Sequence, residues 1–506
     1  MYRNKGTITV FLSLISMLFL SLFCTMAESV RVQAARFQAA AAFDMGLFSI
    51  FGEYDRVLLE EYDLWFLDGS SEEQKIREVL ETKMEKYIQP NINPRYNLVA
   101  GRSWDVFPTE LDRCTVDKYA LATDHGGQVF YSQAVENQKE LFVGEAASAL
   151  KKNIKQMEEG HQKGEEYQNE EQKADESEKE NAEKQEESDT DIKETEAVQA
   201  KVENPLDQIK KIKSMGILGL VLKDGTVVSD KTIERKDLPS ERNLQKGSLL
   251  VDEISADPVS EAIFLNYLQK HFQCAVDEGG KHQKGSKEHS LSYELEYIIG
   301  GQKSDRENLK KTVNRILLIR EGMNYATLAK SAKMRGEAMA LAAAITGAAA
   351  LPEFAGALQK LLMLAWAYGE SLLDVRTLLA KGKVPMLKAE TEWKLPLEKL
   401  GMLAEVLKEY DAGGGSGQSY EDYLSGLLIL GKKQHRNLRV LDLIECNRRM
   451  EKGGETFRVD ALVAQAEASA DFELAPVFLR VPAVWMHVRN QGTAYTIKGQ
   501  YGYGQP

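Results

Sequence analysis

Cysteine is scarce in this sequence, and the positions of the cysteines exclude two common kinds of architecture. The 506 residues contain four cysteines, at Cys24, Cys114, Cys274 and Cys446. Cys24 lies in an apolar N-terminal run, and the other three are far apart, with no Cys-x-x-Cys spacing. Such a set is typical neither of a disulfide framework nor of a zinc site. The redox compartment therefore has to be inferred from the targeting segment.

Familiar catalytic motifs are missing as well. The sequence has no His-Glu-x-x-His motif, no Gly-x-Ser-x-Gly elbow and no Walker A loop. Its densest group of possible metal ligands surrounds a loop rich in Gly and Lys, and comprises His271, Cys274, His282 and His289. Their spacing fits no known zinc pattern, so we predict a solvated loop there and expect neither a metal nor a cofactor.

Excess negative charge is confined to one segment. The net charge is -13, yet residues 158–196 alone hold 17 Asp and Glu against 5 Lys. The remainder of the chain is close to neutral and offers no basic surface for nucleic acid. Because the acidic segment has few apolar residues, we predict a disordered linker or insertion at 158–204. A solvent-exposed helix is the alternative, since Glu and Lys favour helices.

The N-terminus holds one long apolar run, from Ile8 to Ala27, without a charge, Pro or Gly. As a helix it would span about 30 Å, the thickness of the hydrocarbon core of a membrane, so we expect membrane lipid to contact Ile8–Ala27. Arg3 and Lys5 precede the run, which predicts a short cytoplasmic tail at 1–7 and an exported body in a single-pass protein of the cell membrane. A cleaved signal peptide is the alternative, but the helical pattern continues past Glu28 and favours retention.

The exported part is predicted to be an α+β structure that is predominantly helical. We expect a helical stalk and the first part of the exported domain at 28–157, and the main α+β domain at 205–506. Strand signals are fewer: a hairpin at 216–229 around Asp224-Gly225, and two strands at 472–485 and 494–504. These strands predict a small antiparallel sheet.

Two carboxylates could carry acid–base chemistry. Glu294 and Glu296 stand two apart in Tyr293–Tyr297, so on a strand they would face the same side. A solvated strand face explains the same pattern without catalysis. The segment from Asp68 to Glu72 is similar to the start of a metal-dependent adhesion site, but its second serine is one position early, which favours a helix N-cap turn.

Several charged or polar residues interrupt otherwise apolar helices. We predict that they are buried and pair with one another as part of the core. They are Arg320, Glu321, Asn324, Glu370, Asp374 and Arg376.

Longer segments carry a family resemblance. KGTITVFLSLISMLFLSLFCTMAESVRVQAAR at the N-terminus, NPLDQIKKIKSMGILGLVL, LSYELEYIIGGQKSDRENL and LAWAYGESLLDVRTLLAKGKVP resemble an uncharacterised family of membrane-anchored Firmicutes proteins met near tight-adherence (Tad) pilus or type II secretion-like genes. The N-terminus is also similar to Tad minor pseudopilin-like proteins. Gly6 would take the place of their processing-site glycine, although Phe11 stands where those proteins have Glu.

The resemblance implies a non-enzymatic component of a Tad-like pilus or secretion assembly, with protein partners at the cell surface. Two other functions stay open from the residues. One is a membrane-tethered cell-wall hydrolase acting through Glu294 and Glu296, and the other is an extracytoplasmic ligand sensor.

Overall fold

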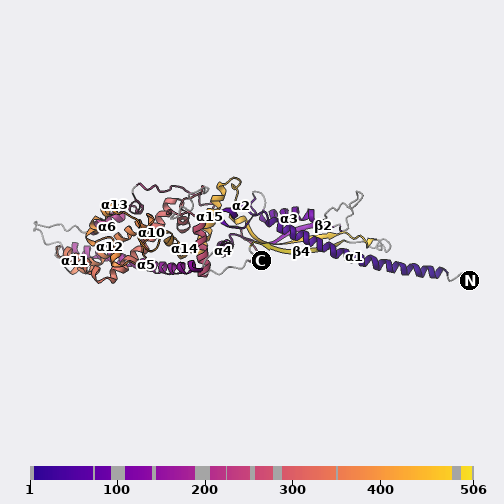
Figure 1. Ribbon diagram of the computed structural model, residues 1–506, viewed down its shortest axis with the longest axis horizontal. Coiled ribbons are helices and arrows are strands. Elements are labelled where there is room, and N and C mark those ends of the chain that lie inside the picture. Colours follow the sequence, from indigo (N-terminus) through magenta and orange to yellow (C-terminus); the bar gives the residue numbers. More distant parts are fainter. Residues whose placement is uncertain are drawn as a thin grey trace. The chain divides into compact units, whose positions relative to one another are not determined.

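The computed structural model describes residues 5–71, 75–92, 107, 109–139, 144–188, 205–223, 225–250, 257–276, 288–348, 352–480 and 492–503. Within them the protein is predominantly helical and has a small antiparallel sheet, as the sequence predicted (Figure 1). In chain order the elements are α1 (Lys5–Phe51), α2 (Arg56–Tyr62), β1 (Leu67–Asp68), α3 (Ile76–Ile92), β2 (Thr109–Leu121), α4 (Asp124–Lys139), α5 (Gly144–Ser188), α6 (Pro205–Ser214), α7 (Ile217–Val221), α8 (Pro258–His271), α9 (Glu294–Gly300), α10 (Asp305–Lys330), α11 (Ala332–Ala348), η1 (Pro352–Phe354), α12 (Ala355–Leu379), η2 (Glu390–Glu392), η3 (Leu397–Met402), α13 (Leu403–Glu409), α14 (Tyr420–Leu430), α15 (Lys433–Met450), η4 (Val459–Ala461), β3 (Leu462–Leu474) and β4 (Thr493–Gly502).

These elements form two compact units, and neither unit is one continuous stretch of chain. Unit 1 takes residues 1–137, 243–254 and 451–506, and unit 2 takes residues 138–242 and 255–450. The sequence had suggested contiguous regions at 28–157 and 205–506. The units are interleaved because β1 and β2 from the first half of the chain pair with β3 near its end.

Helix α1 is uninterrupted over 47 residues, and its surroundings change at Glu28. From Thr7 to Ala27 every side chain is exposed or half-buried, and this part is long and apolar enough to cross a membrane. Glu28 is the first buried side chain: it pairs with Arg31 and accepts a hydrogen bond from the backbone N–H of Phe478 at 2.8 Å. The predicted helical continuation is therefore confirmed. A membrane anchor and an N-terminal signal sequence both fit such a helix.

The second half of α1 packs on the sheet of unit 1. In that sheet β3 is central, with β2 antiparallel along one edge and with β4 and the short β1 following each other along the other. Ala466, Ala468 and Ala470 of β3 lie in one core cluster with Phe43 and Leu47 of α1, together with residues of α3. Small side chains let the helix approach closely, and a Cβ added at Gly499 of β4 would lie 2.8 Å from the Phe43 ring. The sheet therefore fixes the second half of the helix.

The hairpin expected at 216–229 is wrong. Ile217–Val221 is a short helix, α7, because Ile217, Leu220 and Val221 have helical spacing and are buried together. A turn does form, since the N–H of Thr226 donates to the carbonyl of Lys223 at 3.0 Å. Within the described residues no strand lies between this turn and α8, and Val227 is exposed.

The strand expected at 472–485 lies earlier in the chain. β3 runs from Leu462 to Leu474, and Pro476, which has no N–H to donate, comes just after its end. Most of β3 is alanine-rich, a composition that predicts strands poorly. β2 carried no alternation clear enough to be predicted, whereas β4 lies within the expected 494–504 region to one residue at its start.

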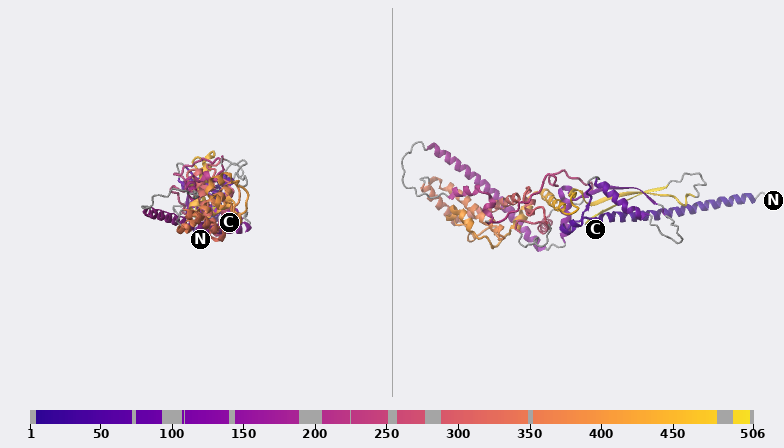
Figure 2. Two further views of the ribbon diagram at one scale, coloured as in Figure 1. Left: turned by 90° about the vertical axis from the view of Figure 1, so that its left-hand side faces the viewer. Right: turned by 90° about the horizontal axis from the view of Figure 1, so that it is seen from above.

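The acidic segment is helical where the structure describes it. Helix α5 runs to Ser188, so residues 158–188 are not a disordered linker, and residues 189–204 lie outside the described chain. One face of its first half is buried in unit 2, where it packs on α10, α12 and α14 (Figures 1 and 2). That face is made of residues spaced four and three apart, namely Asn153, Met157, Gly160, Gly164 and Tyr167.

Glycines bring α5 and α10 into backbone contact. A Cβ at Gly164 would lie 2.8 Å from the carbonyl oxygen of Leu318, and one at Gly322 would lie 2.3 Å from the nitrogen of Gly164. A Cβ at Gly160 would lie 2.8 Å from Ile319. Two of the five residues on the buried face of α5 are thus glycines, which add no apolar side chain, and apolar content alone did not reveal this face.

We expect Gly164→Val to reduce the free energy of unfolding by roughly 1–3 kcal/mol, because the new side chain has no room against Leu318. Glu166→Val is the matched control, since it places the same side chain on the exposed face of α5. Urea unfolding of the full chain in detergent, followed by far-UV circular dichroism, measures both. Equal losses for the two variants would contradict the close packing of α5 on α10.

Candidate functional site

The centre of unit 2 holds a buried ion network. Asp374 of α12 pairs with Arg320 of α10 at 2.8 Å, and Lys388, from the segment after α12, bridges Asp374 and Glu370. Asn324 also donates to Asp374, at 2.9 Å. These side chains are almost completely shielded from solvent.

Arg320 is bound on nearly all sides. Its guanidinium donates to the carbonyl oxygens of Pro385 and Met386, at 3.0 and 2.8 Å, and to the hydroxyl of Tyr423 at 3.2 Å. A fully partnered, enclosed group of this kind has no donor left for a substrate. The prediction that these charges pair within the core is confirmed for Arg320, Asn324, Glu370 and Asp374.

The surroundings shift the pKa values of the two carboxylates of the network in opposite directions. Burial alone would raise the pKa of Asp374, but Arg320 and Lys388 outweigh burial and hold that pKa below its usual value. Burial and the nearby Asp374 raise the pKa of Glu370, although Lys388 opposes them. Lys388 was missed from sequence because it lies in a polar loop rather than on an apolar helix.

Glu321 does not join this network. It is buried on α10, and burial, together with the charge of Glu171 on α5, raises its pKa to about 8, with Lys213 of α6 opposing. A carboxyl with this pKa is mostly protonated at neutral pH.

The carboxylate pair from Tyr293–Tyr297 lies on a helix rather than a strand. Glu294 and Glu296 belong to α9, both are fully buried, and they accept from backbone N–H groups of Gln273 and Ala275, at 2.9 and 2.8 Å. The strand interpretation is wrong because all seven residues of α9 are buried, which removes the alternation a half-exposed strand would show.

Each carboxylate of α9 also has side-chain partners. Glu294 contacts His289 at 2.9 Å and accepts from Asn447 at 2.8 Å. Glu296 accepts from the hydroxyl of Tyr420 at 2.9 Å, and burial raises its pKa to about 7. Neither carboxylate lines either of the two pockets described for this protein.

The possible metal ligands do not converge where the structure describes them. His271, Cys274 and His289 form no group able to hold a metal within that part of the chain, and His282 lies outside it. Asp68 accepts from the N–H of Ser70 at 2.8 Å, which is a local turn of the kind expected there, and Glu72 is outside the described residues.

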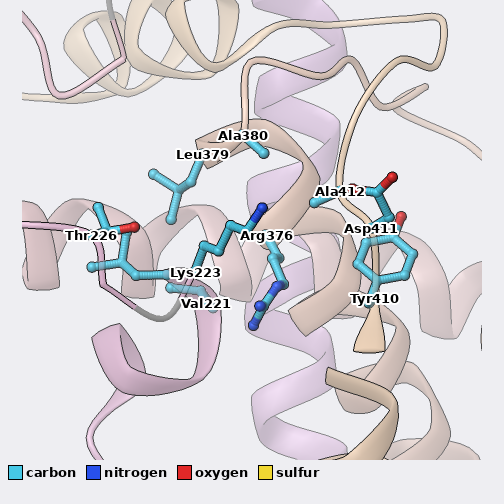
Figure 3. A pocket seen from close by; sticks show the side chains of 10 residues that line it. Val221, Lys223, Thr226, Arg376, Leu379, Ala380, Tyr410, Asp411 and Ala412 are labelled. Atoms are coloured by element: carbon cyan, nitrogen blue, oxygen red, sulfur yellow. The ribbon is translucent and has the colours of Figure 1, made fainter. Parts of the chain in front are cut away.

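A pocket of about 240 Å³ lies elsewhere in unit 2 (Figure 3). Three segments line it: the end of α7 with the residues after it, the C-terminal end of α12, and the residues after α13. Their side chains are Val221, Leu222, Lys223, Thr226, Arg376, Leu379, Ala380, Tyr410, Asp411 and Ala412.

Cationic side chains outnumber acidic ones among the residues that line this pocket. Arg376 and Lys223 line it together with one acid, Asp411. The hydroxyl of Tyr410 contacts Thr377 at 2.9 Å and accepts from Lys394, whose ammonium also lies over the Tyr410 ring. The pocket is thus positively charged on balance.

A family of unknown function (DUF5702) matches residues 195–474, which is more than half of the chain. The protein belongs to this family. No curated protein and no solved structure shows a significant match to the chain. The DUF5702 segment runs from before α6 to the end of β3, so it contains the ion network, the pocket and the buried carboxylates of α9. Helix α1 and all of α5 lie outside it.

Within the DUF5702 segment, Arg320→Met is expected to reduce the free energy of unfolding by about 3–5 kcal/mol, because it leaves Asp374 and Glu370 buried with one cation between them. Lys303→Met is the control: its partner Glu234 is at 2.6 Å, but both side chains are largely exposed. Such an exposed pair contributes about 1 kcal/mol or less. Urea unfolding of the full chain compares them, and a small loss for Arg320→Met would contradict a structural role for the network.

Glu321 gives a pH-dependent prediction. Because its pKa is raised in the folded state, its favourable contribution is fully present below the unfolded pKa of about 4.3 and is lost as the pH rises through about 8. Glu321→Gln should therefore gain stability relative to the native chain between pH 5 and pH 9, by on the order of a few kcal/mol. Melting temperatures across that range test it, with Glu353→Gln, an exposed change, as the control. A difference that does not vary with pH would refute the assignment.

Proposed function

We propose that this protein is a single-pass, membrane-anchored, extracytoplasmic component of a Tad-like pilus or secretion assembly, and that it acts by binding rather than by catalysis. The observation that carries the proposal is an exposed apolar face of α1 that begins at the end of the membrane-spanning run and continues beyond it. The resemblance to a family met near Tad genes supplies the kind of assembly.

This face, called here the α1 stripe, lies opposite the side of the helix that packs on the sheet, except at its end, where the Phe48 ring contacts the edge of the Tyr501 ring of β4. Its large members are strongly exposed, with 79% of Phe37 and 62% of Phe48 accessible. The members follow a spacing of four, four and three residues, which keeps them on one side of a helix. They are Met26, Val30, Ala34, Phe37, Ala41, Met45 and Phe48.

The occupant proposed for the α1 stripe is the apolar helix of another membrane-anchored subunit. The stripe continues directly from Ile8–Ala27 without a break in the helix, so a partner lying along it would also reach the membrane. Helices associate side by side in membranes through close packing, and the small Ala34 and Ala41 between larger side chains suit such a contact. Soluble proteins rarely expose so continuous an apolar surface without a partner.

Two features support retention of the anchor and its orientation. Arg3 and Lys5 stand before the apolar run, which favours a cytoplasmic N-terminus. Cleavage after Ala27 would leave Glu28 at the new terminus of a helix whose buried ion pair with Arg31 belongs to the body of unit 1.

Ligand sensing is the second candidate function, and the pocket around Arg376 favours it. The hydrolase alternative receives less support. Glu294 and Glu296 are enclosed and hydrogen-bonded on α9, whereas a catalytic acid–base pair needs access to a substrate.

Photocrosslinking in intact membranes tests the assembly proposal. We expect the full-length protein with p-benzoylphenylalanine in place of Phe37 to give a crosslinked product that contains a second protein with an N-terminal apolar helix. Mass spectrometry should identify this second protein as a pilus-like subunit or membrane platform of the same assembly. The same substitution at Ser29, which is exposed on the flank of α1, should give several-fold less of that product.

Three outcomes would contradict the proposal. Equal yields from the two positions would show that the α1 stripe is not a specific contact. A product containing only this chain would mean that a second copy covers the stripe. Crosslinks to lipid alone would mean that the stripe lies against the membrane.

A further inference from the structure

Arg376 is the exception among the buried arginines of unit 2. Within the described chain, Arg320 and Arg436 each have a carboxylate partner, Asp374 at 2.8 Å and Glu261 at 2.7 Å. Arg376 is 8% exposed, and the one hydrogen bond that it donates to the described residues is long, from Nη1 to the carbonyl oxygen of Leu220 at 3.3 Å. No described carboxylate lies within ion-pair distance of it.

An unpaired buried guanidinium is costly, and native proteins rarely keep one without a use. Arg376 lines the 240 Å³ pocket, so its remaining N–H donors belong to the wall of that pocket. Lys223 lines the same pocket and likewise has no ion-pair partner among the described residues. Two cations facing one cavity favour an anion within it, and the planar fork of arginine matches carboxylate and phosphate groups.

The rest of the lining limits the kind of anion. Leu379, Ala380 and Val221 provide an apolar wall, so the ligand should carry an apolar body beside its charge. In Figure 3 Arg376 lies between Lys223 on one side and Asp411 on the other, so the acid in the lining favours a negative group on the side of Arg376 that Lys223 occupies. The volume suits a small metabolite and is below the range of pockets that hold drug-sized ligands.

We propose that this pocket binds a small organic anion, whose carboxylate or phosphate group pairs with Arg376 and Lys223 while a short apolar body lies against Leu379 and Ala380. The hydroxyls of Thr226 and Tyr410 supply further polar contacts. The site deepens the second candidate function, ligand sensing, and it stands or fails independently of the α1 stripe.

Three probes of one shape test the proposal on the full-length protein in detergent. Benzoate and phenyl phosphate each join one anionic group to an apolar ring, and benzamide is the neutral counterpart of benzoate. Isothermal titration should show binding of benzoate, phenyl phosphate or both, with benzamide at least tenfold weaker. The two anions distinguish a carboxylate site from a phosphate site.

Variants tie the binding to the pocket. Lys223→Gln, at an exposed position with no ion pair to a described residue, should weaken binding of the anion by about tenfold, and Arg376→Gln should abolish it. Lys303→Gln, on an exposed pair elsewhere in unit 2, should leave binding unchanged. If Arg376→Gln fails to fold, the affinity of Lys223→Gln for the anion decides by itself whether the proposal holds.

The proposal is overturned by any of three results. One is no binding of either anion at about 10 mM, where even a millimolar affinity would fill the site. Another is benzamide binding as tightly as benzoate. The third is unchanged affinity in Lys223→Gln.

Discussion

Unit 2 is organised around Asp374, a buried carboxylate shared by Arg320 and Lys388. Charges without solvent are stable only when their partners are held in position, so each partner constrains the element that carries it. Through this one group α10, α12 and the segment at 385–388 are tied together, and Tyr423 adds α14. The same dependence constrains how these helices are placed along one another, because a shift of one turn would leave a buried charge without its partner.

Unit 1 obeys a different constraint, which acts along a single helix. The first part of α1 is apolar on all sides, and the second part is apolar on two opposite faces, one against the sheet and one exposed. Because the helix is continuous, the position and direction of the sheet of unit 1 follow from those of the apolar run. The apolar run and the body of unit 1 are therefore joined by one unbroken helix, and that holds whether the run is a membrane anchor or a signal sequence.

The buried arginines show how one residue type can serve two purposes. Arg320 meets an acid, a hydroxyl and two carbonyl groups, and its role is complete within the fold. Arg376 lies two residues after Asp374 on the same helix, yet it turns toward a cavity and lacks a charged partner in the described chain. Both lie in the segment shared with the family of unknown function. The difference between them separates a structural charge from one available to a ligand.

Much of this could be anticipated from sequence, and the failures have physical causes. The sequence pattern predicted the uninterrupted α1 and the predominance of helix, because a long apolar helical pattern has few alternative structures. The hairpin at 216–229 and the strand at Glu294–Glu296 were wrong because a segment of only five to seven residues is too short for its pattern to distinguish a buried helical turn from a strand. The burial of α5 at 160–167 was not predicted, because glycine contributes buried surface through the backbone, which composition does not register.

The sequence by itself determined the apolar N-terminal span, the predominance of helix and the fact that charges on apolar helices had to be paired. It could not determine which charges pair. Arg320, Asp374 and Lys388 are distant along the chain, and Lys388 looks like an ordinary loop lysine until the fold brings it to Asp374. Only the tertiary structure decided that Arg320 is partnered and Arg376 is not, because the energy of a buried charge depends on what surrounds it in space.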